Sequence, residues 1–102
     1  MYKVRRIDAN QPQVVKRFRD LGCTVCILSS VGNGVPDILV SYYQAQEKWG
    51  RPWSALIEIK DGSKPPSARK LTPDEQAFHD AWQGEIYVIS TLDEVDALVN
   101  SL

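Results

Sequence analysis

Three charged side chains lie on segments that are expected to be strands, and their spacing allows them to meet. Glu58 and Lys60 are two residues apart in the run Ser54-Ala-Leu-Ile-Glu-Ile-Lys60. Alternate side chains of a strand point to one face of a sheet, so this carboxylate and this ammonium group project together. Asp37, in the run Pro36-Asp-Ile-Leu-Val-Ser-Tyr42, can add a second carboxylate from a neighbouring strand. Two carboxylates and a lysine around one point can make a divalent-metal phosphodiesterase site.

Such a site would hydrolyse a phosphodiester with the help of Mg²⁺ or Mn²⁺. Hard cations of this kind prefer carboxylate, carbonyl and water oxygens, so Asp37 and Glu58 are the expected metal ligands. Lys60 is then expected to position or activate the water and to stabilise the charge of the transition state. The alternative is structural: Glu58 and Lys60 form a surface ion pair, and Asp37 is a turn residue after Pro36.

A second candidate motif is the CxxC spacing of Cys23 and Cys26, which occurs in zinc and redox proteins. The segment around it is rich in strand-forming residues, and positions three apart on a strand face opposite ways. Thiols that point apart cannot share a metal ion or readily form a disulfide, and His79 is the only histidine of the chain. We therefore expect two buried, reduced thiols, with a redox or zinc protein as the alternative.

The charged residues need a sheet and helices to position them, and periodicity and composition predict where these lie. In order, the predictions are a helix from Asn10 to Gly22, strands over 24–28, 37–43 and 54–60, a helix from Thr72 to Gly84, a strand over 86–90 and a helix after Thr91. The order αβββαβα predicts an α/β fold with a mixed four-stranded sheet flanked by helices. The whole chain, 1–102, is expected to be a single domain.

The helix that follows the site strands has a distinct start signal. Thr72 is expected to be its N-cap, and Glu75 at the third helical position completes a capping box. Because capping explains Glu75 fully, we assign it no role in the site. Phe78 and Trp82, four residues apart, are expected to form the buried stripe of this helix.

The first and last helices have weaker start signals. Asn10 is expected to be an N-cap, followed by Pro12 in the first turn, where a missing N–H costs little. The last helix is expected to start at a capping box formed by Thr91 and Glu94. Its apolar residues are expected to be buried; they are Leu92, Val95, Leu98 and Val99.

Taken in order, three segments resemble the PD-(D/E)xK nuclease superfamily. They are Gly34-Val-Pro-Asp-Ile-Leu-Val40, Ile57-Glu-Ile-Lys60 and Leu71-Thr-Pro-Asp-Glu-Gln76. The set is similar to the small stand-alone VRR-NUC branch, which bacteriophages often carry and which is similar to Holliday-junction resolvases. The resemblance extends over nearly the whole chain. It implies a restriction-endonuclease-like core and metal-dependent cleavage of DNA, with branched or junction DNA as one expected substrate.

The resemblance also implies further site residues. The backbone carbonyl of Ile59 is expected to be a third metal ligand. Gln76 is expected to reach the site and orient water or phosphate, with an exposed helix glutamine as the alternative. Relatives usually carry an acidic residue, frequently glutamate, on the first helix, whereas this chain has no glutamate there. Asp8 is the nearest acid and is assigned as a metal ligand, with Asn10 and Gln11 as neutral stand-ins.

Contacts to nucleic acid are expected from a glycine-rich loop and a basic segment. Gly32 and Gly34 permit positive φ and a close backbone approach to a phosphate, although a tight connection between strands explains them equally well. Lys64, Arg69 and Lys70 follow the site strand and are candidate phosphate contacts. The formal net charge is −1, so the expectation depends on how the cations are distributed rather than on their excess.

The expected partners are DNA and a second copy of the chain, because junction-cleaving relatives form two-fold dimers. No organic cofactor is expected. No run of about 18 apolar residues and no signal-peptide pattern occurs, so we expect no membrane span and a cytoplasmic location, in the host if a phage encodes the chain. The alternative function is a non-catalytic DNA-binding or assembly module. The weakly acidic charge and the missing first-helix glutamate favour this module, whereas the intact Asp37, Glu58 and Lys60 set opposes it.

Overall fold

The order of helices and strands confirms the αβββαβα prediction. The computed structural model describes residues 7–44 and 50–102. Its elements are α1 (Gln11–Asp20), β1 (Thr24–Ile27), β2 (Ile38–Tyr43), β3 (Pro52–Ile59), the 3₁₀ turn η1 (Pro66–Ala68), α2 (Pro73–Ala81), β4 (Ile86–Ile89) and α3 (Leu92–Asn100). The 3₁₀ turn, within the connection from β3 to α2, is the one addition to the predicted order in the described part of the chain.

The four strands form one mixed sheet, as predicted, and their order in it is β1-β2-β3-β4. The first three make an antiparallel meander, in which Val40 of β2 faces Ala55 of β3. Strand β4 then pairs in parallel with β3, with Glu58 opposite Val88. A parallel neighbour requires a crossover connection, and α2 with its flanking loops provides it.

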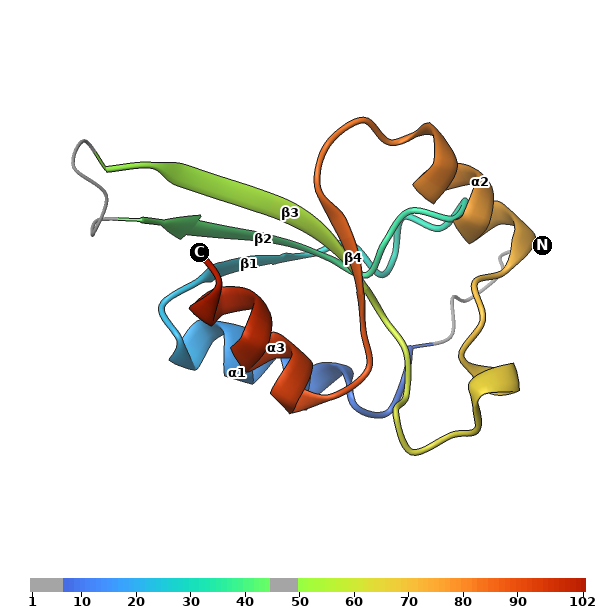
Figure 1. Cartoon of the computed structure of the whole chain (residues 1–102). Helices are drawn as coiled ribbons and strands as arrows, with labels where there is room; N and C mark the ends of the chain where they lie inside the picture. The colour runs from blue at the N-terminus through green and yellow to red at the C-terminus, as the bar shows by residue number, and fades with distance from the viewer. Residues whose placement is uncertain (1–6, 45–49) are drawn as a thin grey trace.

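The hydrophobic core lies on one face of this sheet, beneath α1 and α3. These two helices pack side by side in Figure 1. Phe18 of α1 and Val95 of α3 are fully buried against Ile38 and Ile57 of the central strands. Because alternate residues of β3 face opposite ways, Glu58 must project from the other face, between Ile57 and Ile59, which both face the core.

Helix α2 lies apart from this core, beside the loop that joins β1 to β2 (Figure 1). Its capping box is present, but none of its residues is buried, so the prediction that Phe78 and Trp82 form a buried stripe is wrong. The two rings instead stack on each other, 5.5 Å apart, and Trp82 is 45% exposed. Their helical spacing predicted their mutual contact but not which surface would cover them. The helix ends at Ala81, before the predicted Gly84, because Trp82 has extended backbone.

Asn10 attaches the N-terminus of α1 to the sheet instead of capping the helix. This residue occupies the N-cap position, but its side chain makes no capping hydrogen bond. Its Nδ2 donates instead to the carbonyls of Lys60, at 2.9 Å, and Ser90, at 3.2 Å. The start of α1 is thereby tied to the ends of β3 and β4. In α3, Thr91 caps the helix as predicted and Val95 and Val99 are buried, but Leu92 is 37% exposed.

The two cysteines have different surroundings, so the prediction that both are buried is wrong. Cys23 belongs to the hydrophobic core, and burial raises the pKa of its thiol. Cys26 is exposed, and both thiols are free. Among the described residues, neither cysteine joins a group of His, Cys, Asp or Glu that could hold a metal. The structure therefore supplies no partner for a zinc or redox CxxC motif.

Candidate active site

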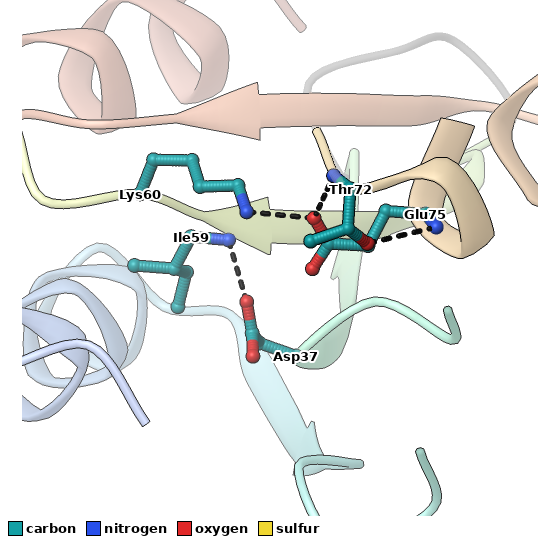
Figure 2. Close-up of polar contacts among 5 residues, drawn as sticks. All are labelled: Asp37, Ile59, Lys60, Thr72 and Glu75. Atoms are coloured by element: carbon teal, nitrogen blue, oxygen red, sulfur yellow. Dashed lines mark hydrogen bonds and ion pairs between the residues drawn. The ribbon is translucent and has the colours of Figure 1, made fainter. Parts of the chain in front are cut away.

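Asp37 lies immediately before β2 and turns its carboxylate toward β3 (Figure 2). Its Oδ2 accepts a hydrogen bond of 2.7 Å from the backbone N–H of Ile59, and its side chain is only 4% exposed. The N–H and C=O of a strand residue point to the same side of the strand. The carbonyl of Ile59 therefore faces the same side of β3 as the Asp37 carboxylate.

Glu58 is a buried carboxyl group surrounded by other carboxyl groups. It is 1% exposed. Its pKa is raised from 4.5 to about 11, chiefly by burial and in addition by hydrogen bonds with Asp37 and Glu75 and by their negative charges. In the metal-free protein, Glu58 therefore holds a proton that it shares with neighbouring carboxylates. Such a cluster is stable only while a proton or another cation reduces the repulsion between its members.

Lys60 ends the site strand and pairs with the first turn of α2. Its Nζ lies 2.7 Å from Oε1 of Glu75, and the two side chains are only 11% and 13% exposed. The same Oε1 accepts the backbone N–H of Thr72 at 2.8 Å, which closes the capping box (Figure 2). Burial tends to raise the pKa of Glu75, but hydrogen bonds with Glu58 and Lys60 lower it to about 2. Glu75 is therefore an ionised anchor for Lys60.

These residues line a pocket of about 210 Å³ at the ends of β2 and β3. Its lining consists of Asp8, Asp37, Glu58, Ile59, Lys60, Thr72 and Glu75. Burial raises the pKa of Asp8, which also experiences the charges of Lys60 and Asp37. Asp8, assigned as the acid nearest to the first helix, thus lies in the same pocket as the two strand carboxylates.

Other predicted site residues lie outside this lining. The Nε2 of Gln76 donates to Asp80 on the exposed surface of α2, at 2.8 Å. Lys64 and Lys70 are exposed, and Arg69 is half-buried, on the connection between β3 and α2. Lys64 is near enough to Asp8 to act on its pKa, so this basic segment begins close to the pocket.

The glycine-rich loop packs against α2. Gly32 and Gly34 have φ of +75° and +80°, as expected for positions that only glycine occupies easily. A Cβ on Gly34 would lie 2.3 Å from the carbonyl oxygen of Asp74, whereas a Cβ on Gly32 would meet nothing within 4 Å. Close packing between the loop and α2 thus accounts for Gly34 in this structure.

Glu75 was assigned no role in the site from the sequence, and Asn10 was named only as a helix cap and a neutral stand-in for the missing acid. Glu75 was interpreted as a capping residue alone, although its position just after the site strand in the chain was a usable signal. Asn10 carries no such signal, because its bond to the carbonyl of Lys60 joins residues fifty positions apart. Both residues hold the end of β3 in place.

A larger groove of about 540 Å³ runs along α1 and the edge strand β1. Its lining is mostly apolar, and among the described residues Asp20 is its one acidic residue. It therefore lacks the paired carboxylates that a metal site needs. The smaller pocket contains the carboxylates and the lysine. Its size suits a cation, water and a phosphate oxygen better than an organic ligand.

A solved structure described as a VRR_NUC domain is 25% identical in sequence and superposes with a TM-score of 0.61. The match covers 88% of this chain and 89% of that chain. No protein-family model and no curated protein matches the sequence.

The mixed sheet, its flanking helices and this structural match together define the class. The chain has a restriction-endonuclease-like α/β fold of the VRR-NUC type, as the sequence resemblance implied. In the described part of the chain, no helix is long and apolar enough to cross a membrane.

Proposed function

We propose that this chain is a Mg²⁺- or Mn²⁺-dependent endonuclease that hydrolyses phosphodiester bonds in DNA. The observation that carries the proposal is the pocket in which Asp37, Glu58, Ile59 and Lys60 meet at the end of β3. The nuclease fold shared with a VRR_NUC domain supports the same conclusion.

The donor set suits a hard divalent cation. Asp37 and Glu58 would hold it through carboxylate oxygens, and the Ile59 carbonyl would be a third ligand; Asp8 lines the same pocket. No group of three or more His, Cys, Asp or Glu side chains in residues 7–44 and 50–102 is arranged to hold a metal unaided. Mg²⁺ commonly keeps several waters and takes one or two carboxylates, so two carboxylates and a carbonyl are sufficient.

Each residue then has a defined task. A cation held there would supply Lewis-acid polarisation of the phosphate and would lower the pKa of a bound water. Lys60 presents its ammonium group beside the carboxylates, where it can donate to a phosphoryl oxygen or to the attacking water. Gln76 stays a predicted site residue, and it would have to leave Asp80 to reach the substrate.

The test is a cleavage assay on supercoiled plasmid and on a four-way DNA junction, with Mn²⁺ or with chelator. We expect nicks that require the metal and that disappear in Asp37→Asn and Lys60→Met. Asp37→Asn keeps an oxygen that can accept from Ile59, so loss of activity with an unchanged circular dichroism spectrum would identify a chemical role. Preferential cutting of the junction would support structure selectivity.

The second candidate is a nuclease-fold module that binds DNA without cutting it. The raised pKa of Glu58 favours it, since a protonated carboxyl is a poor metal ligand. Absence of cleavage on every substrate, combined with retained DNA binding, would decide for the module. A homodimer is part of the proposal for either function, and sedimentation velocity measures it.

A further inference from the structure

The Glu75 carboxylate takes part both in the cap of α2 and in the pocket, where it contacts Lys60 and Glu58. One oxygen, Oε1, accepts both the Thr72 backbone N–H of the α2 capping box and the ammonium group of Lys60. A surface capping residue needs only the first of these bonds. The second bond crosses from α2 to the end of β3, and both partners are largely shielded from solvent.

The Glu75–Lys60 bond matters because little else fixes the position of α2. The helix has no buried residue, so hydrophobic packing fixes it only weakly. Its first turn meets the site at the close approach of Gly34 to the Asp74 carbonyl and at Glu75, which pairs with Lys60 and shares a hydrogen bond with Glu58. Movement of α2 and movement of the Lys60 ammonium group are therefore coupled through one carboxylate.

Lysine itself needs such an anchor. Its side chain has four flexible carbon–carbon torsions and loses about 2 kcal/mol of rotamer entropy when it is held in one geometry. A reacting group displaced by about 1 Å can lower a rate by roughly a hundredfold. A buried charge-assisted bond is the kind of contact that keeps an ammonium group in one place.

We infer that Glu75 is a positioning residue that holds the Lys60 ammonium group at the pocket, in addition to capping α2. The inference rests on the proposed nuclease function. It concerns the rate of the chemical step rather than substrate binding, because Glu75 carries no positive charge with which to attract a phosphate.

The chain offers a matched control in α3. Glu94 stands at the same position of a similar cap: Thr91 Oγ1 accepts its N–H at 3.2 Å, and its Oε1 accepts the Ser90 N–H at 3.2 Å. Glu94 does not line the pocket. Glu75→Ala and Glu94→Ala therefore both remove a capping carboxylate, but only the first also removes the partner of Lys60 and a hydrogen-bond partner of Glu58.

The experiment measures kcat and KM for metal-dependent cleavage by the four variants Glu75→Ala, Glu75→Gln, Glu94→Ala and Glu94→Gln. We expect Glu75→Ala to lower kcat about 10- to 100-fold with little change in KM. Glu75→Gln should recover part of the loss, because glutamine keeps the capping box and a neutral acceptor for Lys60. Both Glu94 variants should cleave like the wild type. Equal rates for Glu75→Ala and Glu94→Ala would overturn the inference.

A second measurement separates this inference from the nuclease proposal. Thermal melts of Lys60→Met, Glu75→Gln and the double variant, all with chelator, report whether the two side chains interact. We expect the double variant to melt at a higher temperature than the sum of the two single shifts predicts. If the wild type cleaves nothing, the nuclease proposal fails, and additive shifts would then overturn the Glu75–Lys60 contact as well.

Discussion

At the scale of single residues, Glu58 has a protonation state that the fold sets and a cation can reverse. Its pKa is raised from 4.5 to about 11, first by burial and then by Asp37 and Glu75. An unfolded chain would lose the Glu58 proton near pH 4.5, whereas the metal-free folded chain retains it. Folding therefore takes up a proton over the range between these two values, and stability falls as pH rises through it.

Glu58→Gln replaces this carboxyl by a neutral group of similar shape. In chelator, we expect the variant to melt above the wild type at pH 8, and the difference to shrink toward pH 5, where the unfolded carboxyl also begins to be protonated. Differential scanning calorimetry of both proteins across this pH range measures the difference in melting temperature. A difference that is independent of pH would contradict the raised pKa.

Mn²⁺ is expected to act on the melting temperatures of the wild type and Glu58→Gln in the opposite sense to a rise in pH. Under the proposed function, binding of Mn²⁺ would require ionised Glu58, and a ligand that binds only the folded state raises its stability. We therefore expect Mn²⁺ to raise the melting temperature of the wild type at pH 8 and to leave Glu58→Gln nearly unchanged. Equal shifts in both proteins would place the metal elsewhere.

At the scale of elements, the loop between β1 and β2 controls where α2 sits. Gly34→Ala should destabilise the protein more than Gly32→Ala does. Both substitutions place alanine at positive φ, which costs about 1–2 kcal/mol. Only Gly34→Ala adds a clash with the Asp74 carbonyl, worth about 1–3 kcal/mol more as overpacking. Urea unfolding measures the difference, and equal losses would show that the loop moves away freely.

The helices also differ in how much of the fold depends on them. Phe18 is fully buried in α1, whereas Trp82 at the end of α2 is 45% exposed. We expect Phe18→Ala to cost about 3–5 kcal/mol of unfolding free energy, through lost burial and a cavity. Trp82→Ala should cost about 1 kcal/mol, mainly its stacking on Phe78. Urea titrations of both variants provide the test, and comparable losses would mean that α2 contributes to the core.

At the scale of the whole molecule, the net charge of −1 means that any hold on DNA must be local. Lys64 and Lys70 are exposed on the connection that leads from the pocket to α2. Each is expected to contact a phosphate, so replacing either by alanine should reduce the slope of log affinity against log salt by about one unit. Fluorescence anisotropy with labelled duplex in Ca²⁺ measures the slope.

Lys16 is the matched control for this measurement. It is also an exposed lysine, but it lies on α1 and pairs with Asp20 at 2.7 Å. Lys16→Ala should leave the salt slope unchanged. If all three alanine variants alter the slope equally, DNA contacts lysines over the whole surface and does not prefer the segment beside the pocket.

The sequence was sufficient for the order of elements and for the strand residues that line the pocket, namely Asp37, Glu58, Ile59 and Lys60. Period-two spacing placed Glu58 and Lys60 on one sheet face, and the capping signal at Thr72 located the start of α2. These are local properties, because strand alternation and helix caps depend on neighbours within a few residues. The same locality explains why the boundaries of most elements were close to those observed.

Tertiary structure decided which surfaces are covered and which polar groups meet. The spacing of Phe78 and Trp82 is amphipathic, yet no other element buries them, and Asn10 bonds to the ends of two strands instead of capping its helix. Glu75 could be recognised as a cap from its sequence position, but its bond to Lys60 exists only because α2 returns to the end of β3. Such contacts join residues far apart in the chain, and local spacing does not encode which of them folding brings together.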